Sequence, residues 1–541
     1  MVTAVSASPG ESVCTPGVYQ RRRPERTLAY QTVQAWLATW IAYREATDDE
    51  AVPAYIEREL RAYLECGILA HGFARARCPD CTAEFLVAFS CKGRGVCPSC
   101  TTKRMAATAA HLVDSVIPRV PMRQWVLSLP KRLRPALRNH AALATRVLRI
   151  FISSIQRELR RSAAAPVGAR IGAVSFLQRF GSALNEHWHY HCCVSDGVFA
   201  AADGQTLAFM PATIDVADIV ARVQARVRGR VLALYCRHGV LSEEDAQNMA
   251  GWDHGGGFSV DASVGIAADD RPALERLLRY CARPCWASER LTQADDGERL
   301  IYLFDKPRPD GSWQVTLTPI ELLDRLARFI PPPRRHLHRY HGVFAPHSAL
   351  REQVTARAGE AIAASVAPLV PGSASAAGSA TSAPSAGSAA AESPAAAPPP
   401  STVCTPAAPA TPEDLAAAIR LQLGLPTAIR PIPEPILAAP PGARAWARLI
   451  ARIFDADPLR CRRCGGSMQL IAFITERAVI VRILDHLGEP SRAPRMAPIR
   501  GPPGASALQQ RADHDARRSL NLDPPVDVMP DYENQNQDLV W

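Results

Sequence analysis

The sequence predicts an α+β fold, with an antiparallel central sheet and helices on one face of it. Short apolar runs rich in β-branched and aromatic residues predict strands at 123–129, 171–180 and 186–194. Longer segments with helical spacing of apolar residues predict helices at 136–161, 215–235 and 271–282. Strands and helices thus alternate from about residue 122 onward.

The remaining elements follow from the same patterns. Helical periodicity in 27–65 predicts a small helical region before the sheet. Apolar patterning also predicts three further strands, one before the helix at 271–282 and two after it, and one further helix. The strands are 257–267, 299–304 and 313–318, and the helix is 319–330.

The composition changes near residue 366. Residues 366–411 consist almost entirely of Ala, Ser, Pro and Gly and predict a flexible linker. The linker leads to a small C-terminal module at 412–495, in which 476–488 predict a helix that packs on a nearby CxxC segment. The polar, Pro-rich residues 496–541 predict a disordered tail.

Composition and charge narrow the class of protein. The chain has 541 residues, 47% hydrophobic and 21% charged, enough for two or three globular domains. A net charge of +10 and a pI of about 9.0 favour a polyanionic partner, most commonly nucleic acid, over a basic surface that binds nothing. We expect a cytoplasmic protein with no membrane partner, because neither a signal-peptide core nor an uninterrupted apolar span is present in the sequence.

Cysteine spacing is the strongest local signal. Cys78 and Cys81, and Cys97 and Cys100, form two CxxC pairs separated by fifteen residues. Four thiolates in this pattern fit a closed, tetrahedral, structural Zn²⁺ site. The alternative is a set of reduced cysteines in a small core. We therefore expect a zinc-binding domain at 20–110.

Other cysteines have less defined roles. Cys66, His71 and Cys91 lie close to the CxxC pairs in sequence. They could form part of a second site, exchange into the first, or be ordinary buried groups. A third CxxC, Cys461 and Cys464, has no second pair after it, so a zinc site there needs ligands from elsewhere in the chain.

Three histidines alternate with other residues in "EHWHYHCCV": His187, His189 and His191. Alternate residues of a strand share a face, so these imidazoles are expected to point the same way. Two or three imidazoles can hold a divalent ion that keeps positions open for phosphate oxygens. The same pattern also occurs on polar strand faces that bind nothing.

A tyrosine downstream offers the histidines a chemical partner. The helix at 271–282 contains Tyr280, and tyrosine is a competent covalent nucleophile when a metal or a base activates it. Together with a preceding zinc module, this favours phosphoryl transfer on nucleic acid. The alternative for Tyr280 is a packing role on the helix. Asp269 and Asp270 are more simply an N-cap with first-turn charge than part of an acidic metal triad.

The chain resembles the rolling-circle transposases of bacterial insertion sequences, which carry an HUH motif (histidine, bulky apolar residue, histidine). His189-Tyr190-His191 matches this motif within "SALNEHWHYHCCVSDGVF". "ECGILAHGFARARCPDC" and "SCKGRGVCPSC" resemble the family's zinc-binding domain, "RYCARP" its nucleophile helix, and "PPPRRHLHRYHGVFAPHS" its closing segment. The resemblance covers about residues 20–350, and more loosely 412–495.

The resemblance implies an HUH-type sheet in a catalytic domain at 120–350. His189 and His191 would bind Mg²⁺ or Mn²⁺. Tyr280 would attack the scissile phosphate in single-stranded ends of the element, giving a 5′-phosphotyrosine and a free 3′-OH that can be rejoined. The protein would act at the nucleoid of a bacterial cell, and a homo-oligomer is compatible with the family.

The third ligand is left open by the resemblance. His187 shares the strand face and is our first candidate, with Gln178 and Asp196 as alternatives. Some members of the family carry two tyrosines four residues apart on the nucleophile helix. Here these positions hold Arg276 and Pro284, so the chain resembles the single-tyrosine branch.

Two further tyrosines are weighed against Tyr280. Tyr190 is expected on the opposite face of the strand from the histidines, and Tyr340 is the rival nucleophile. We expect Tyr340 to contact DNA instead, together with basic residues around the zinc knuckle and in the closing segment. These residues are Lys92, Arg94, Arg334, Arg335 and Arg339. A solvated basic surface is the alternative.

Two other functions remain open. A plasmid replication initiator or a conjugative relaxase would use the same chemistry. A non-catalytic zinc-finger DNA-binding protein, such as a decayed transposase, would bind DNA without forming a covalent adduct.

Overall fold

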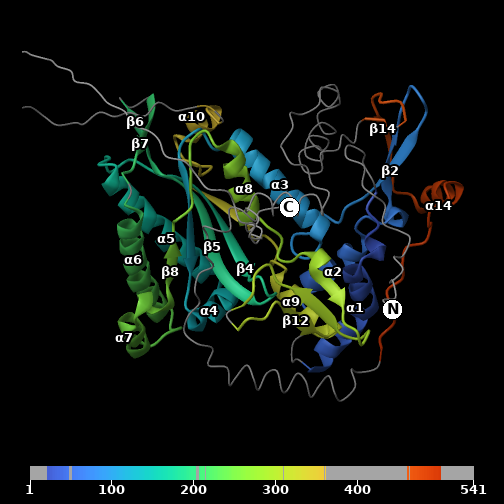
Figure 1. The fold of residues 1–541 in the computed structure, drawn as a ribbon, viewed down its shortest axis with the longest axis horizontal. Coiled ribbons are helices and arrows are strands. Elements are labelled where there is room, and N and C mark those ends of the chain that lie inside the picture. Colours follow the sequence, from blue (N-terminus) through green and yellow to red (C-terminus); the bar gives the residue numbers. More distant parts are fainter. Residues whose placement is uncertain are drawn as a thin grey trace, which may run out of the picture.

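The central sheet is antiparallel, with the strand order β13-β4-β5-β3-β8, and a short strand, β9, also pairs with β3 (Figure 1). The long strand β5 lies in the middle and pairs with β4 on one side and β3 on the other. The strands are β3 Met122–Ser128, β4 Gly172–Phe180, β5 Glu186–Ser195, β8 Ser259–Asp261, β9 Gly265–Ile266 and β13 His338–Gly342.

These strands belong to a computed structural model, which describes residues 21–47, 51–202, 206–213, 215–308, 310–358, 360, 460–461 and 463–500. The expected linker at 366–411 lies outside the described residues, as do 412–459 of the expected C-terminal module. Of the expected tail, only 496–500 are described. Within the part of the chain that is described, no helix combines the length and apolar content needed to cross a bilayer.

Helices cover both faces of the central sheet, whereas the sequence predicted one covered face. The helices α5 (Ala141–Ser162) and α6 (Val216–Arg237) pack on the face that presents Trp125, Leu127 and Tyr190. On the other face α3 (Pro98–Ser115) and α8 (Arg271–Cys281) pack over apolar residues of β3 and β4, namely Met122, Val126, Val174 and Phe176. Because β3 and β4 carry apolar residues on both sides, each side needs its own cover.

Smaller elements complete this half of the molecule. The helix predicted at 136–161 is broken at His140 into α4 (Arg134–Asn139) and α5. A hairpin of β6 (Gly197–Ala202) and β7 (Thr206–Pro211) extends from the end of β5. The remaining helices here are α7 Glu243–Gly251 and α10 Arg351–Ala356.

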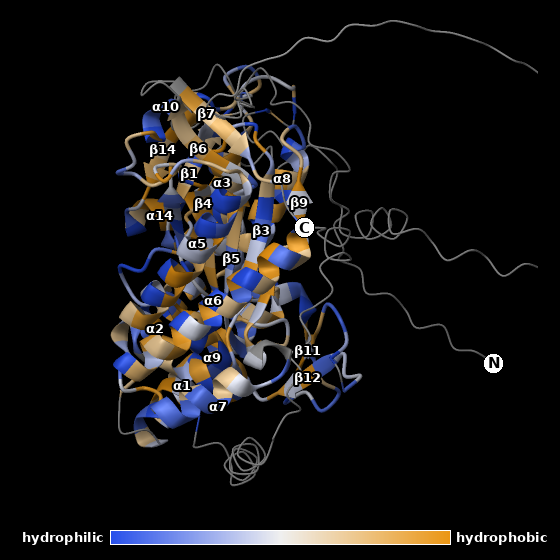
Figure 2. Cartoon of the chain, turned by 90° about the vertical axis from the view of Figure 1, so that its left-hand side faces the viewer, coloured by the Kyte–Doolittle hydropathy of each residue, from blue (hydrophilic) through white to orange (hydrophobic). Residues whose placement is uncertain are grey.

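A second core joins the N-terminal helices to a segment that lies late in the sequence. The helices α1 (Leu28–Thr47) and α2 (Ala54–Glu65) share buried residues with α9 (Pro319–Phe329). The Trp40 indole N–H donates to the Asp324 carboxylate at 2.8 Å across this contact. A small sheet of β10 Leu291–Gln293, β11 Leu300–Leu303 and β12 Gln314–Leu317 packs here too. Figure 2 shows both hydrophilic and hydrophobic residues on these helices, as expected for elements with one buried face.

A third sheet contains a strand from the far end of the chain. Its order is β14-β1-β2, with β1 (Phe73–Arg77) in the middle, β2 (Glu84–Ala88) on one side and β14 (Gln469–Ile474) on the other. The helix α14 (Arg477–His486) follows β14 and packs on Leu69 and Phe73. The described part of the expected C-terminal module therefore completes the N-terminal region (Figure 1).

Short 3₁₀ turns connect these parts. They are Pro24–Arg26, Leu69–His71, Lys131–Leu133, His254–Gly257 and Ser288–Arg290.

Candidate functional site

The three histidines of β5 point to one face of the central sheet. The ring centroids of His187 and His189 are 4.7 Å apart, and those of His189 and His191 are 4.8 Å apart. In register, His189 lies between Gln178 of β4 and Ser128 of β3. Directly opposed residues of antiparallel strands share a face, so these polar side chains belong to the same surface.

Tyr280 reaches this surface from α8. The Tyr280 ring stands perpendicular to the His191 imidazole, with 5.3 Å between their centroids. The side chain is 8% exposed, and burial raises the pKa of its hydroxyl, an effect that the nearby Arg283 partly offsets. The Arg283 guanidinium lies 4.9 Å from the centre of the Tyr280 ring. Asp270 caps the start of α8 by accepting from the Ala273 amide, as the sequence predicted.

Two glutamines connect the histidines to α8. Gln178 donates its side-chain amide to the carbonyls of Tyr280 and Cys281, at 3.1 and 3.0 Å. Gln124 of β3 places its amide group 2.8 Å from Nδ1 of His191. Among the described residues, neither the Gln178 carbonyl oxygen nor Nε2 of His191 has a hydrogen-bond partner, although both atoms are buried. Unpaired buried polar atoms are costly, and a ligand at this point would satisfy them.

Burial also sets the protonation of the histidines. It lowers the pKa of His189 and of His191 well below the usual value. The pKa of His187 falls to about 3, through burial and then the charge of Arg134. All three imidazoles are therefore neutral at physiological pH, which is the form that binds metal ions. Nδ1 of His189 lies 3.1 Å from the His187 carbonyl oxygen. A proton on Nδ1 would be bound there, leaving Nε2 as the lone-pair nitrogen.

Of the three candidates for a third ligand, two lie beside His189. Gln178 lies directly opposite His189 on the neighbouring strand β4. His187 lies two residues before His189 on β5, and its Nε2 is 3.4 Å from the Ser128 hydroxyl. Asp196 does not lie at this site. It follows the far end of β5 and forms an ion pair with Arg123 at 2.8 Å. Five residues of strand separate it from His191 by roughly 16 Å.

The two other tyrosines occupy different positions. Tyr190 points to the opposite face, where its hydroxyl donates to the Ala144 carbonyl at 2.9 Å. Tyr340 lies on β13 opposite Val174, two strands away from β5, which corresponds to about 10 Å across the sheet. Arg351 lies 5.2 Å from the centre of the Tyr340 ring. Of these tyrosines, Tyr280 is the one that contacts the histidine row.

The four cysteines predicted to share one zinc ion are divided between two clusters. Cys97 and Cys100 converge with Cys66 and Cys91, whereas Cys78 and Cys81 converge with Cys461 and Cys464. In each cluster the four sulfur atoms lie within 4.8 Å of one another. The division arises because β1 and β2 carry the first CxxC away from the second, which begins α3. His71 belongs to neither cluster. Such four-cysteine sets are the usual ligands of structural Zn²⁺.

The first of these clusters also supports the segment that follows Tyr280. Between Cys91 and Cys97, the carbonyl of Val96 accepts from the Trp286 indole at 2.8 Å. The carbonyl of Gly95 accepts from the Cys285 thiol at 3.3 Å. The loop between Cys91 and Cys97 thus contacts the chain five and six residues after Tyr280.

The residues expected to contact DNA do not form one surface. Lys92 and Arg334 are exposed, and Tyr340 is half-buried on β13. Arg94 donates to the main-chain carbonyl of Arg335, which joins the zinc region to the closing segment. Arg335 and Arg339 line a cavity of about 660 Å³ behind the central sheet, on the face opposite the histidines.

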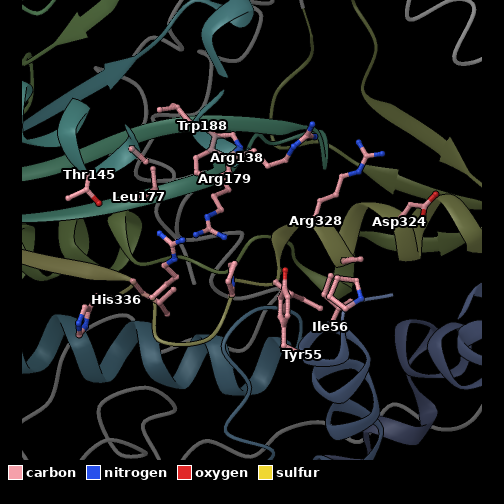
Figure 3. Close-up of a pocket in the computed structure, with 18 of the residues that line it drawn as sticks. Tyr55, Ile56, Arg138, Thr145, Leu177, Arg179, Trp188, Asp324, Arg328 and His336 are labelled. Carbon is pink, nitrogen blue, oxygen red and sulfur yellow. The ribbon is translucent and has the colours of Figure 1, made fainter. Parts of the chain in front are cut away.

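Arginine and aromatic side chains line this cavity (Figure 3). Arg179 extends into it from β4 and lies 4.9 Å from the ring centre of Trp188, while Tyr55 projects from α2 on the opposite wall (Figure 3). Burial, and then the positive charge of Arg335, lower the pKa of Arg179. Within the described part of the chain, neither arginine forms an ion pair with a carboxylate. This leaves an excess of positive charge facing the cavity. Sequence patterns gave no signal for Arg179 or Tyr55, because the cavity forms only when α2, β4 and the closing segment meet.

Two family models match the chain. A model described as "Transposase zinc-binding domain" matches residues 36–129, and one described as "Putative transposase" matches 172–352. The first contains the Cys66 cluster together with Cys78 and Cys81, and the second contains β4, β5 and Tyr280. Cys461 and Cys464 lie outside both. No curated protein and no solved structure matches the chain.

Proposed function

Because the chain belongs to the IS91-family transposases that carry an N-terminal zinc-binding domain, we propose a specific chemistry for it. The protein nicks and rejoins single-stranded DNA at the ends of its element, through a 5′-phosphotyrosine on Tyr280. The element then moves by a rolling-circle mechanism. Membership of a transposase family implies DNA binding and strand cleavage; the single-stranded substrate and the tyrosine intermediate are the proposal.

The observation that carries the proposal is the meeting of Tyr280 with His191. The Tyr280 ring, on α8, lies against the face of the sheet that carries the neutral imidazoles, with its centroid 5.3 Å from that of His191. The sequence separates these residues by nearly ninety positions. A packing role for Tyr280 would explain its burial, but it would not explain the two buried, unpartnered acceptor atoms on Gln178 and His191.

The chemistry of these atoms suits a divalent cation. His189 and His191 would supply imidazole nitrogens and Gln178 a carbonyl oxygen, a mixed set that could hold Mn²⁺ or Mg²⁺. When bound, such an ion neutralises charge on the scissile phosphate. Gln178 is favoured as the third ligand because its oxygen has no hydrogen-bond partner among the described residues, whereas Nε2 of His187 lies 3.4 Å from the Ser128 hydroxyl.

Gln124 would orient the His191 ring through a hydrogen bond to Nδ1, the nitrogen that does not bind the cation. As placed, its amide nitrogen faces Nδ1 of His191. Rotating the amide by 180° exchanges nitrogen and oxygen with almost no change in shape. The Gln124 oxygen then accepts from Nδ1–H and leaves Nε2 of His191 free to bind a cation, the usual arrangement behind a metal-binding histidine.

Tyr280 performs the covalent step. Its oxygen attacks phosphorus and forms the O–P bond as the bond from phosphorus to the 3′ oxygen breaks. The tyrosine proton is lost, and the departing oxygen takes up a proton to become the 3′-OH. Rejoining runs the same exchange in reverse. Arg283, beside the Tyr280 ring, stabilises the developing phenolate. Arg276, the position of a second tyrosine in some relatives, is exposed on α8.

The arginine-lined cavity would hold part of the bound strand. Guanidinium groups bind phosphate oxygens, and the Tyr55 and Trp188 rings offer surfaces on which a base can stack. The cavity lies on the far side of the sheet from Tyr280, so it would bind a section of DNA away from the cut.

A cleavage assay tests the proposal. The full chain is incubated with end-labelled single-stranded DNA from its element, with Mn²⁺ or with EDTA, and separated on a denaturing gel. A metal-dependent protein–DNA adduct is expected that Tyr280→Phe and His189→Ala both abolish. Tyr340→Phe tests the rival nucleophile and should still form the adduct.

Each alternative function predicts a different result. A replication initiator or relaxase would form the same adduct but would select another DNA sequence. DNA binding without any adduct, in protein whose fold is intact, would favour a non-catalytic zinc-finger protein.

A further inference from the structure

Cys78 and Cys81 lie in a tight loop between β1 and β2. The Cys78 amide donates to the Ala83 carbonyl at 2.8 Å, and the Thr82 amide donates back to the Cys78 carbonyl at 3.0 Å. Thr82 adopts a φ of 62°, in the left-handed region that β-branched residues rarely enter. The loop therefore holds a conformation that the residue type does not favour.

The C-terminal CxxC forms an equivalent loop. The Cys461 amide donates to the Gly466 carbonyl at 2.7 Å, and the Gly465 amide donates back to the Cys461 carbonyl at 3.0 Å. Gly465, at the position equivalent to Thr82, has a φ of 76°. The amide of Arg463 also donates to the Cys461 sulfur at 3.4 Å. Two loops from distant parts of the chain thus share one hydrogen-bond pattern, which turns both cysteines of each loop the same way.

The two loops face each other with their sulfur atoms in contact. Sγ of Cys78 is 3.5 Å from Sγ of Cys464, and Sγ of Cys81 is 3.4 Å from Sγ of Cys461. Four sulfur atoms arranged tetrahedrally at a Zn–S distance of about 2.3 Å would be about 3.8 Å apart. The observed separations are close to this value and far longer than a disulfide bond, about 2.05 Å.

Strand pairing places the loops at the same end of the sheet. β1 ends at Arg77, one residue before the first loop, and its partner in β14 is Gln469, shortly after the second loop. An isolated bridge between Arg460 and Ser467 closes the second loop at its base. The backbone therefore brings the four thiols together without any rearrangement.

We propose that Cys78, Cys81, Cys461 and Cys464 hold a structural Zn²⁺ of their own, which fastens residues 460–500 to the N-terminal zinc-binding domain. The matched zinc-binding model ends at residue 129, so half of this ligand set comes from outside it. The site is distinct from the one formed by Cys66, Cys91, Cys97 and Cys100, and the protein carries two zinc ions per chain.

Polar contacts hold the end of this segment, where Glu489 pairs with Arg21 and Arg23 and the Arg500 amide donates to the Thr39 hydroxyl. The apolar contacts of β14 and α14 are fewer. β14 is an edge strand, and its Leu470, Ile471 and Phe473 side chains are 45%, 48% and 67% exposed. From α14, only Ile480 and Leu484 are buried. Little apolar surface thus holds β14 and α14 in place, and a four-thiolate ion next to β14 would add stability there.

Zinc stoichiometry tests the proposal directly. Full-length protein, purified without added chelator, is measured by elemental analysis, and two zinc ions per chain are expected. Cys464→Ser combined with Cys461→Ser should lower the count to one. Cys464→His should keep two, since imidazole replaces thiolate as a zinc ligand. Cys236→Ser, which changes a cysteine outside both clusters, is the matched control and should also keep two.

Hydrogen exchange separates loss of the site from loss of the fold. In the double serine variant, amides of 469–486 should exchange at least tenfold faster, while those of β5 remain protected. A wild-type count of one, or a double variant that retains two zinc ions, would overturn the proposal. So would unchanged protection of 469–486 in a variant that has lost one ion.

Discussion

The Tyr280 ring meets the His191 imidazole edge to face, at 90° and with 5.3 Å between centroids. Tyr280 lies in the last turn of α8, and His191 lies in the middle of β5, the longest strand of the sheet. Gln178 spans the same gap by donating to the main chain of Tyr280 and Cys281. The position of the nucleophile is therefore fixed by the same side chain that we propose as a metal ligand.

Removing the Gln178 side chain should weaken metal binding. We expect Gln178→Ala to lower Mn²⁺ affinity by about 10- to 100-fold, while Gln178→Glu, which keeps an oxygen ligand, retains it. His187→Ala should cost less than tenfold. Calorimetric titration with Mn²⁺ measures each variant, with Gln293→Ala, an exposed glutamine of β10, as the control. A larger loss in His187→Ala than in Gln178→Ala would identify His187 as the third ligand instead.

The cleavage rate should rise with pH. Burial raises the pKa of Tyr280, so the hydroxyl is protonated at neutral pH, and the reactive phenolate becomes more abundant as pH increases toward that pKa. Single-turnover cleavage at saturating metal should accelerate between pH 7 and 9, by up to about tenfold per unit. A flat profile over this range would mean that a neighbouring base removes the proton or that another step limits the rate.

The link between the first cysteine cluster and the nucleophile can be weakened selectively. Trp286→Phe keeps the aromatic bulk but leaves the Val96 carbonyl unpaired, so we expect a loss of about 1 kcal/mol in unfolding free energy and a slower formation of the adduct. Trp313→Phe, at a side chain that is 57% exposed, should change neither. Denaturant unfolding and adduct kinetics measure the two effects, and a normal rate in Trp286→Phe would show that this contact does not position Tyr280.

The arginine-lined cavity should contribute to strand binding. Replacing Arg179 with Gln should weaken binding of single-stranded DNA several-fold and reduce the salt dependence of affinity by about 0.7 in the log–log slope. Arg226→Gln, at an exposed position of α6, removes the same charge elsewhere and serves as control. Fluorescence anisotropy at several salt concentrations gives both quantities. Equal losses in the two variants would indicate a general charge effect and no defined site.

Patterning in the sequence was enough to place the main elements of the candidate site. The alternation in 186–194 and the helical spacing in 271–282 correctly predicted β5 and α8, because each depends on local periodicity. The one-sided position of His187, His189 and His191 follows from that strand alone.

Contacts between residues far apart in the chain could not be predicted from local sequence patterns. The cysteine grouping was mispredicted, because nothing local indicates that Cys81 meets Cys461 rather than Cys97. The place of Gln124 beside His191 could not be predicted, because it depends on the register of β3 on β5 and a lone glutamine belongs to no motif. The packing of α3 and α8 on the second face of the sheet also depends on distant contacts. The sequence did not predict it, because α3 begins within the cysteine-rich segment, far from the strands that it covers.

The most direct test of the central claim identifies the residue that becomes linked to DNA. After reaction with Mn²⁺, the adduct is digested with nuclease and trypsin, and the modified peptide is sequenced by mass spectrometry. We expect a nucleotide joined through its 5′ phosphate to Tyr280, in a peptide within residues 277–290. A nucleotide on Tyr340 or on any other residue would contradict the account.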